Sequence, residues 1–351
     1  MGRIMDLEIF VQEYWDIYKK EVEILSKSNP DFKSYAIKLF NDNLKSVKDL
    51  HKVYLNKEVS SEELRDAFRT ISLYCFIHFE KLISFPQVQG NKTTNNDIVA
   101  FMLSEGKGSR LSLMGLNTEK AMLEMPSANG FSPLVQLAYD DLRVNGIKTV
   151  FTTSDRTRPF YNVIFGKEDN IILTEKSGNN KHEALVECVK SLDSIPTAIF
   201  RTCGDTLRDE DLLRLGMQKY FDLPNPEDYI VVLAKELDST KKNGLSSVSV
   251  KTDGDVAIQF TKSPSILPGD NSLLYKVGSL IGKNCLSELI SLGNIDYNTF
   301  CNNLQEGKVL VVTTASSKNK GIDDVFDLRD YAKEMLGVKS IYDAVKGRYW
   351  K

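Results

Sequence analysis

The sequence predicts an α/β fold, a Rossmann-like and doubly wound, mostly parallel sheet, preceded by an all-α bundle. With 351 residues, 42% of them hydrophobic, the chain is long enough to bury more than one core. Apolar residues recur at three- and four-residue spacing over the first 85 residues, whereas short apolar strands alternate with amphipathic helices beyond residue 97. We therefore expect a helical bundle at residues 1–88 and an α/β domain at residues 97–345.

Three helical runs are predicted to make up the bundle. The first covers residues 9–25, and the second covers residues 37–54. The third begins at Ser60, which has the spacing of a capping box with Glu63. Aromatic stripes along these runs favour a packed core over a cofactor site. The polar segment 86–96, with Pro, Gly and Asn, marks the domain boundary.

Strands and helices of the α/β domain follow in order after this connector. Strands are predicted at residues 98–103, 146–153, 171–173 and 196–201, and helices at residues 132–142 and 183–192. An Asp-Gly turn at Asp253 and Gly254, followed by alternating apolar residues, predicts a hairpin. Alternation of strands and helices places ligands at the carboxyl ends of the parallel strands.

The composition is that expected of a cytoplasmic enzyme. A formal net charge of −3 leaves no basic surface for nucleic acid, which makes a nucleic-acid binder an unfavoured class. The five cysteines are scattered and form no C-x-x-C pair, which indicates reduced thiols without a zinc site. The first residues lack the apolar core of a signal peptide, and no apolar run approaches the ~20 residues of a membrane span.

A glycine-rich turn follows the first predicted strand. The strand ends at Leu103 and leads into Ser104-Glu105-Gly106-Lys107-Gly108-Ser109-Arg110. Glycines have no Cβ, so backbone N–H groups can close on a triphosphate, and Arg110 supplies a forked cation. Lys120 follows in the next segment, which would let one loop hold phosphates from two sides. The turn is therefore predicted to bind phosphate.

This turn resembles the signature of the sugar-1-phosphate nucleotidyltransferases, L-[AG]-[AG]-G-x-G-[TS]-R-[LM] followed by a lysine. It lacks the Gly-Lys-[Ser/Thr] of a Walker A loop, and Leu111 stands where a dinucleotide fingerprint has its third glycine. The resemblance implies a GT-A-like core that condenses an NTP with a sugar 1-phosphate to give an NDP-sugar and pyrophosphate. It implies catalytic roles for Arg110 and Lys120. It also implies nucleotide-binding roles for Leu103, Ser104, Glu105, Gly106, Gly108 and Ser109.

Two acidic segments are similar to the magnesium-binding positions of that family. Asp205 follows a strand and a glycine, which points its carboxylate to the carboxyl edge of the sheet, and Mg²⁺ prefers such oxygen ligands. The resemblance implies a second ligand from a terminal [DN]-x-x-x-D-L segment, which Asp323 fits best, with Asp324 in reserve. The alternative is that both aspartates cap the helix from Asp327 onward.

Two further positions are implied by the resemblance. The segment 253–264 is similar to D-G-x-V-x-x-x-x-E-K-P, which makes Lys262 the candidate contact for the acceptor phosphate; an exposed lysine at a strand end is an equal alternative. Thr261 stands in place of the glutamate. Glu175 and Gly178 lie where the family reads the base. An ionised glutamate only accepts hydrogen bonds, which favours cytosine or guanine over uracil.

Three functions remain open at this point. They are the sugar-1-phosphate nucleotidyltransferase, a cytidylyltransferase acting on a non-sugar phosphate such as phosphocholine, and a catalytically silent homologue that serves as a regulatory or interaction subunit. The presence of Gly106, Gly108, Arg110, Lys120 and Asp205 in one chain favours an enzyme. Its expected partners are an NTP and a phosphorylated small molecule, with Mg²⁺ as cofactor. The N-terminal helices leave a protein partner or a homo-oligomer open.

Overall fold

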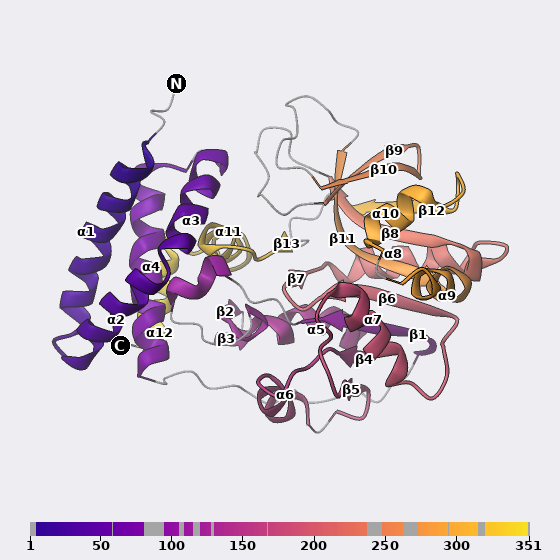
Figure 1. Cartoon of the computed structure of the whole chain (residues 1–351), viewed down its shortest axis with the longest axis horizontal. Helices are drawn as coiled ribbons and strands as arrows, with labels where there is room; N and C mark the ends of the chain where they lie inside the picture. Colours follow the sequence, from indigo (N-terminus) through magenta and orange to yellow (C-terminus); the bar gives the residue numbers. More distant parts are fainter. Residues whose placement is uncertain are drawn as a thin grey trace.

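The structure, a computed structural model, has a helical part and an α/β part (Figure 1). It describes residues 5–57, 59–80, 95–104, 109–114, 120–127, 130–166, 168–236, 248–262, 273–293, 295–314 and 320–349. The candidate residues Glu105, Gly106 and Gly108 lie outside the described residues. No helix within the described ranges combines the length and the apolar character needed to cross a membrane.

Four helices form the N-terminal bundle: α1 (Leu7–Leu25), α2 (Asp31–Asp42), α3 (Leu44–Lys57) and α4 (Ser61–Phe79). The prediction of three was wrong because the second run divides at Asn43. The Asn43 side-chain amide donates to the Leu39 carbonyl at 2.8 Å, and the backbone carbonyl of Asn43 accepts from the Ser46 amide. Such local bonds compete with the continuous helical ladder. The predicted capping box of Ser60 and Glu63 is present at the start of α4.

A nine-stranded sheet forms the centre of the α/β part, in the order β5-β4-β1-β6-β11-β8-β12-β10-β9. Its strands are β1 (Asn95–Leu103), β4 (Ile147–Phe151), β5 (Ile171–Leu173), β6 (Ala198–Cys203), β8 (Ile230–Glu236), β9 (Val248–Asp253), β10 (Val256–Lys262), β11 (Leu273–Gly282) and β12 (Val309–Thr314). Strands β5, β4, β1, β6, β8 and β12 share one direction, and β11 runs antiparallel between β6 and β8. The predicted mostly parallel sheet is confirmed.

An antiparallel hairpin, β9–β10, ends the sheet at one edge. Its turn contains Gly254 at φ 58°, a backbone conformation that glycine adopts without steric cost. The hairpin predicted from Asp253 and Gly254 is therefore present.

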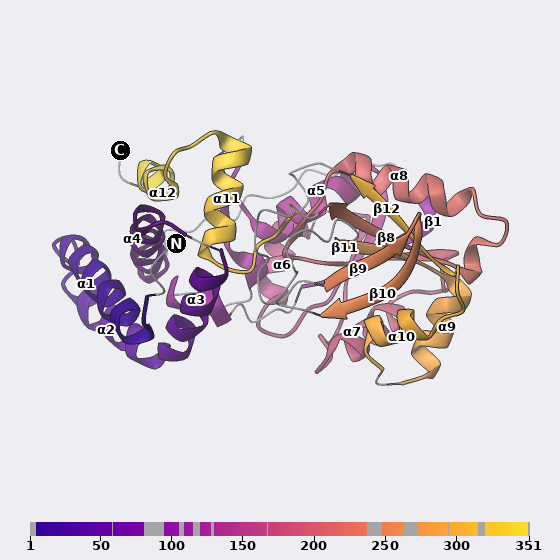
Figure 2. The same ribbon diagram turned by 90° about the horizontal axis from the view of Figure 1, so that it is seen from above.

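Helices cover both faces of the sheet, as a doubly wound fold requires. One face packs against α5 (Leu134–Val144), α6 (Arg158–Phe165) and α8 (Glu210–Phe221), and the other against α7 (Lys181–Lys190), α9 (Lys283–Ser291) and α10 (Tyr297–Asn303). Figure 2 shows α5 and α8 above the strands and α7, α9 and α10 below them. Successive side chains of β1 point to opposite faces of the sheet, so Met102 belongs to one core and Phe101 to the other.

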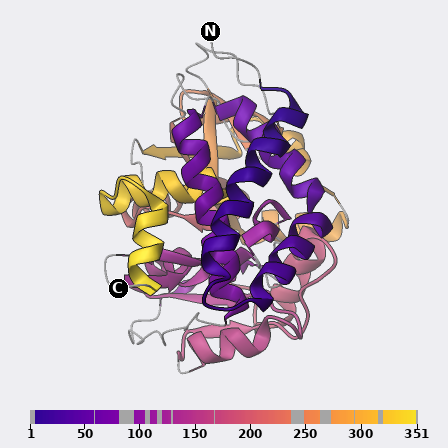
Figure 3. The same cartoon turned by 90° about the vertical axis from the view of Figure 1, so that its left-hand side faces the viewer.

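The bundle and the sheet share a continuous apolar core. The last helices, α11 (Val325–Leu336) and α12 (Ile341–Tyr349), follow the sheet in sequence but pack against α4 (Figures 1 and 2). One buried cluster joins Phe10 of α1, Val345 of α12 and Met102 of β1. The Tyr74 hydroxyl of α4 also donates to the Glu124 carbonyl at 2.7 Å. Figure 3 shows the bundle in front of the strands, so its helices cover part of the α/β part.

We expect a fragment of residues 97–351 to be insoluble when expressed alone. Removing α1–α4 uncovers Ile341 and Val345, which are fully buried in the whole chain, and each such side chain contributes about 1.5–3 kcal/mol through burial. The soluble fraction and the elution volume of the fragment measure this, with residues 1–90 co-expressed in trans as the control. A soluble, monomeric fragment with cooperative thermal unfolding would show instead that the α/β part folds independently.

Candidate active site

The candidate site lies at the carboxyl ends of β1 and β6. Along the chain, β4 and β5 add to one side of β1, and β6 then adds to its other side. The carboxyl edge at such a reversal of strand order is the usual place for ligands in open α/β sheets. Leu103 and Ser104 leave the sheet here from β1, and Gly204 and Asp205 leave it from β6.

Gly204 allows the two strand ends to lie against each other. Its amide donates to the Leu103 carbonyl at 3.1 Å, and a Cβ on Gly204 would lie 2.8 Å from the Cβ of Ser104. Ser104 is fixed in turn by Thr152 after β4. The Ser104 amide donates to Thr152 Oγ1 at 2.9 Å, and its hydroxyl donates to the Thr152 carbonyl at 2.8 Å. A side chain at position 204 would clash with Ser104, so the close approach of the two strand ends requires glycine before Asp205.

A short ladder brings the second predicted aspartate next to the first. Strand β7 (Thr206–Leu207) directly follows Asp205 and pairs antiparallel with β13 (Lys320–Gly321). The Ile322 amide continues this ladder by donating to the Asp205 carbonyl at 3.0 Å. Because Ile322 is fully buried, the residue after it, Asp323, turns toward the site.

Lys120 lies between these two carboxylates. It begins the 3₁₀ helix η2 (Lys120–Met122), and only 5% of it is exposed. Its ammonium contacts the Asp205 carboxylate and lies 2.8 Å from Asp323 Oδ1, and the Arg110 guanidinium approaches the same oxygen at 3.9 Å. Burial by itself would lower the pKa of Lys120, but Asp205 and Asp323 raise it above the usual value. Four residues singled out in the sequence thus meet in one cluster.

Asp323 and Asp324 differ in what they contact. Asp324 is the N-cap of α11, and its carboxylate accepts from the amides of Phe326 at 2.9 Å and Asp327 at 3.0 Å. It is fully buried and pairs at 3.5 Å with Lys57 of the bundle. The helix-capping alternative therefore describes Asp324, and the helix begins at Val325 instead of Asp327. Through Lys57, the bundle contacts the loop that carries Asp323.

Two carboxylates that converge on one cation fit a Mg²⁺ ion. Mg²⁺ takes one or two protein carboxylates and completes its shell with water and phosphate oxygens. Asp205 and Asp323 reach the same ammonium, so both could reach one metal ion. Within the described residues, no three His, Cys, Asp or Glu side chains gather to form a larger metal site. Magnesium dependence stays a prediction.

A cavity of about 240 Å³ opens beside this cluster. Leu103, Ser104 and the turn before α7 line it, including Gly178. Gly178 has φ 75°, and a Cβ there would lie 2.4 Å from the amide nitrogen of Ala184, so the turn requires glycine. Glu175 is exposed and lies outside the cavity lining, and its carbonyl accepts a hydrogen bond from Arg158. Its contact with a base stays a prediction.

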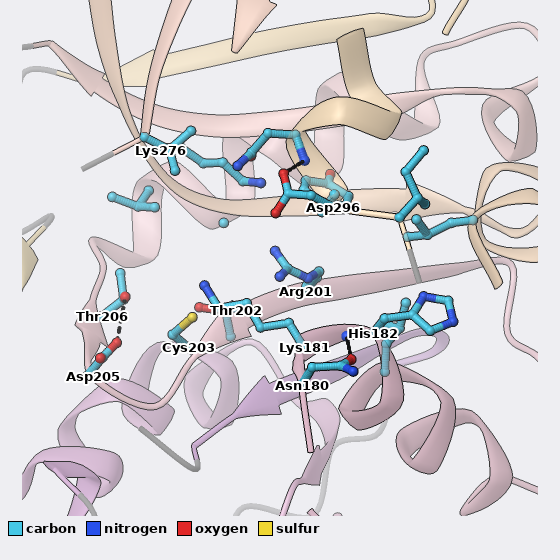
Figure 4. A pocket seen from close by; sticks show the side chains of 18 of the residues that line it. Asn180, Lys181, His182, Arg201, Thr202, Cys203, Asp205, Thr206, Lys276 and Asp296 are labelled. Carbon is cyan, nitrogen blue, oxygen red and sulfur yellow. Dashed lines mark hydrogen bonds between the residues drawn. The ribbon is translucent and has the colours of Figure 1, made fainter. Parts of the chain in front are cut away.

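A second cavity, of about 460 Å³, extends from Asp205 along the α7 and α10 side of the sheet. Figure 4 shows Arg201 near its middle, Lys276 above, Lys181 below, and Asp205 toward one end. Arg201 and Lys276 were not predicted as site residues from the sequence. A cation inside an otherwise apolar strand was the pattern that could have indicated them. The side chain of Lys262, the predicted acceptor contact, lies outside the described residues, as does that of Ser109.

Arg208 was also not predicted from the sequence, although it lies three residues after Asp205. Its guanidinium donates two hydrogen bonds to the Asp141 carboxylate, both at 2.8 Å, and the two side chains are almost fully buried. It also donates to Thr202 Oγ1 and to the Thr206 carbonyl, which lie on either side of the Gly204-Asp205 turn. Arg208 is therefore a positioning residue for the Asp205 backbone.

Comparisons with known proteins find similarity in structure but none in sequence. No family model matches the chain, and no curated protein matches it in sequence. CMP:2-keto-3-deoxy-manno-octonic acid synthetase complexed with CTP superimposes with a TM-score of 0.48 at 16% identity, over 69% of this chain and 99% of its own. The inositol-1-phosphate CTP transferase from T. maritima superimposes with a TM-score of 0.49 at 16% identity, over 72% of this chain and 98% of its own.

Proposed function

We propose that the protein is a nucleotidyltransferase that joins an NTP to a phosphorylated acceptor and releases pyrophosphate. The convergence of Arg110, Lys120, Asp205 and Asp323 at the carboxyl edge of β1 and β6 carries this proposal. Two cations suit a polyphosphate, and two adjacent carboxylates suit the Mg²⁺ that accompanies it. The two cavities that meet at Asp205 offer space for a nucleotide and for an acceptor.

The reaction is an in-line displacement at the α-phosphorus of the NTP. An oxygen of the acceptor phosphate forms the new P–O bond, the bond to the β-phosphate breaks, and the electron pair leaves with pyrophosphate. No protein nucleophile is required. Lys120 would offset the negative charge at the α-phosphate, and Arg110 would neutralise the departing phosphates. Asp205 and Asp323 would hold Mg²⁺, which supplies further positive charge to the phosphates.

For the acceptor we propose a sugar 1-phosphate. The larger cavity is lined by Arg201 and Lys276, and its volume of about 460 Å³ suits a small phosphorylated molecule. Phosphocholine carries a quaternary ammonium that these two cations would repel. The face of Tyr297, which an ammonium group could otherwise use, is already in contact with Lys276 and Arg201.

A pyrophosphate-release assay tests the function directly. Each of the four NTPs would be paired with a panel of sugar 1-phosphates and with phosphocholine, in the presence of Mg²⁺. We expect turnover with at least one sugar 1-phosphate, and we expect Asp205→Asn to lower kcat by about 10²-fold or more while the NTP still binds. The asparagine keeps the shape of the side chain and removes its charge.

Asp211→Asn is the matched control, because Asp211 is a highly exposed residue of α8 that pairs only with Arg214 across one helical turn among the described residues. Its kcat should equal that of the natural protein. If the protein binds an NTP but none of the acceptors supports pyrophosphate release, the silent-homologue alternative is favoured. Turnover that phosphocholine alone supports would replace the sugar 1-phosphate by a non-sugar acceptor.

A further inference from the structure

The larger cavity contains two cations that face no acidic partner. Arg201 is only 8% exposed, and Lys276 lies on the neighbouring strand β11. Both contact one aromatic ring, since the Arg201 Cζ lies 4.6 Å and the Lys276 Nζ 3.7 Å from the centre of Tyr297. Within the described part of the chain, no carboxylate comes within ion-pair distance of either group. A buried charge without a counter-ion is costly, and cavity space beside it allows a ligand to supply that counter-ion.

The other charged groups of this cavity do not neutralise the pair. Asp296 lines the cavity, but its carboxylate accepts hydrogen bonds from the amides of Asn298 at 2.9 Å and Thr299 at 3.4 Å. Lys181, at the start of α7, adds a third positive charge. Asp205 and Asp323 also line the cavity, but both carboxylates pair with Lys120. The middle of the cavity is therefore electropositive.

The ionisation of Lys276 agrees with a site that receives an anion. Burial, together with the positive charges of Arg201 and Lys181, lowers the pKa of Lys276 to about 7. Cys203 of β6 and Cys301 of α10 face it with a small opposing effect. An anion bound here would raise this pKa again, so binding above pH 7 would take up a proton.

We propose that Arg201 and Lys276 bind an oxyanion of the acceptor, a carboxylate or a phosphate, apart from the reacting phosphate at the Lys120 cluster. This inference rests on the proposed function, because it assumes that the larger cavity holds the acceptor. Arg201 precedes Asp205 by four residues, and at ~3.3 Å per residue along a strand the two backbone positions lie at most roughly 13 Å apart. The acceptor class is therefore a sugar 1-phosphate with a second acidic group.

Reductive methylation of lysines, followed by peptide mass spectrometry, tests the subsite locally on the full chain. At pH 7.5 the neutral fraction of Lys276 should react faster than exposed Lys283, and inorganic phosphate should slow its reaction by about fivefold or more as the amine takes up a proton. Glucuronate serves as the carboxylate probe. Protection by both probes, or by one alone, tells which oxyanion the subsite holds.

Arg201→Gln should abolish this protection, whereas Arg214→Gln, at an exposed arginine of α8, should leave it unchanged. Should Arg201→Gln unfold, Lys276→Met provides a second variant, in which phosphate binding measured by calorimetry should weaken by about tenfold. Binding of both probes to the natural protein should also weaken as the pH rises through 7. Full protection in Arg201→Gln, or none in the natural protein, overturns the subsite.

Turnover separates this proposal from the proposed function. In the pyrophosphate assay, Arg201→Gln should raise KM for glucuronic acid 1-phosphate by about tenfold and leave KM for glucose 1-phosphate nearly unchanged. Equal rises for both acceptors would mean that the pair holds the reacting phosphate, which overturns the second acidic group but keeps the function. Protection of Lys276 requires no turnover, so it can succeed even if no acceptor supports pyrophosphate release.

Discussion

Lys120→Met is expected to lower kcat by about 10²–10³-fold, since a preorganised charge at a phosphoryl-transfer site commonly contributes that much. Lys120 is 5% exposed and contacts both Asp205 and Asp323. Methionine keeps a long unbranched side chain and removes the ammonium, so two carboxylates then face each other without their cation. Steady-state pyrophosphate release and the thermal midpoint Tm measure activity and fold in the same preparations.

Two controls accompany this variant. Lys190→Met removes a lysine whose side chain is 64% exposed, and its kcat should match that of the natural protein. Lys120→Arg retains the charge but replaces a point charge by a planar fork, so we expect it to recover only part of the activity. A folded Lys120→Met protein with near-natural kcat would remove the cluster from the catalytic site and, with it, the main support for the proposed function.

Arg208→Met is expected to reduce the free energy of unfolding by about 3–5 kcal/mol, because it leaves a buried carboxylate without its partner. Arg208 and Asp141 form a bidentate pair with almost no exposed surface. Urea unfolding at constant pH measures the loss. Arg214→Met is the matched control, and we expect a change within about 0.5 kcal/mol because its pair with Asp211 is exposed.

A double variant separates the two tasks of Arg208. Arg208→Met with Asp141→Leu removes the stranded carboxylate and should recover most of the lost stability. It does not restore the bonds to Thr202 and the Thr206 carbonyl that flank the Asp205 turn, so kcat should stay low. A double variant with natural stability and natural kcat would show that Arg208 stabilises the fold without ordering the turn.

Much of the candidate site could be predicted from short segments. The strand ending at Leu103 and the Asp253-Gly254 hairpin each depend on neighbours within a few residues, so periodicity and glycine chemistry were sufficient. Lys120, Asp205 and Asp323 were expected on a resemblance, and the structure brings their side chains together. The division at Asn43 was missed because a single residue's hydrogen bonds overrode a continuous apolar pattern.

The sequence by itself determined the helical character of the N-terminal segment, the alternation that makes a doubly wound sheet, and the chemistry available at the strand ends. Only the tertiary structure decided that β11 lies antiparallel beside β6, which places Lys276 near Arg201, and that β7 pairs with β13, which places Asp323 beside Asp205. It also decided that α12 packs on α4 and that Arg208 meets Asp141. Local preferences depend on adjacent residues, whereas ion pairs and burial depend on which distant segments the fold brings together.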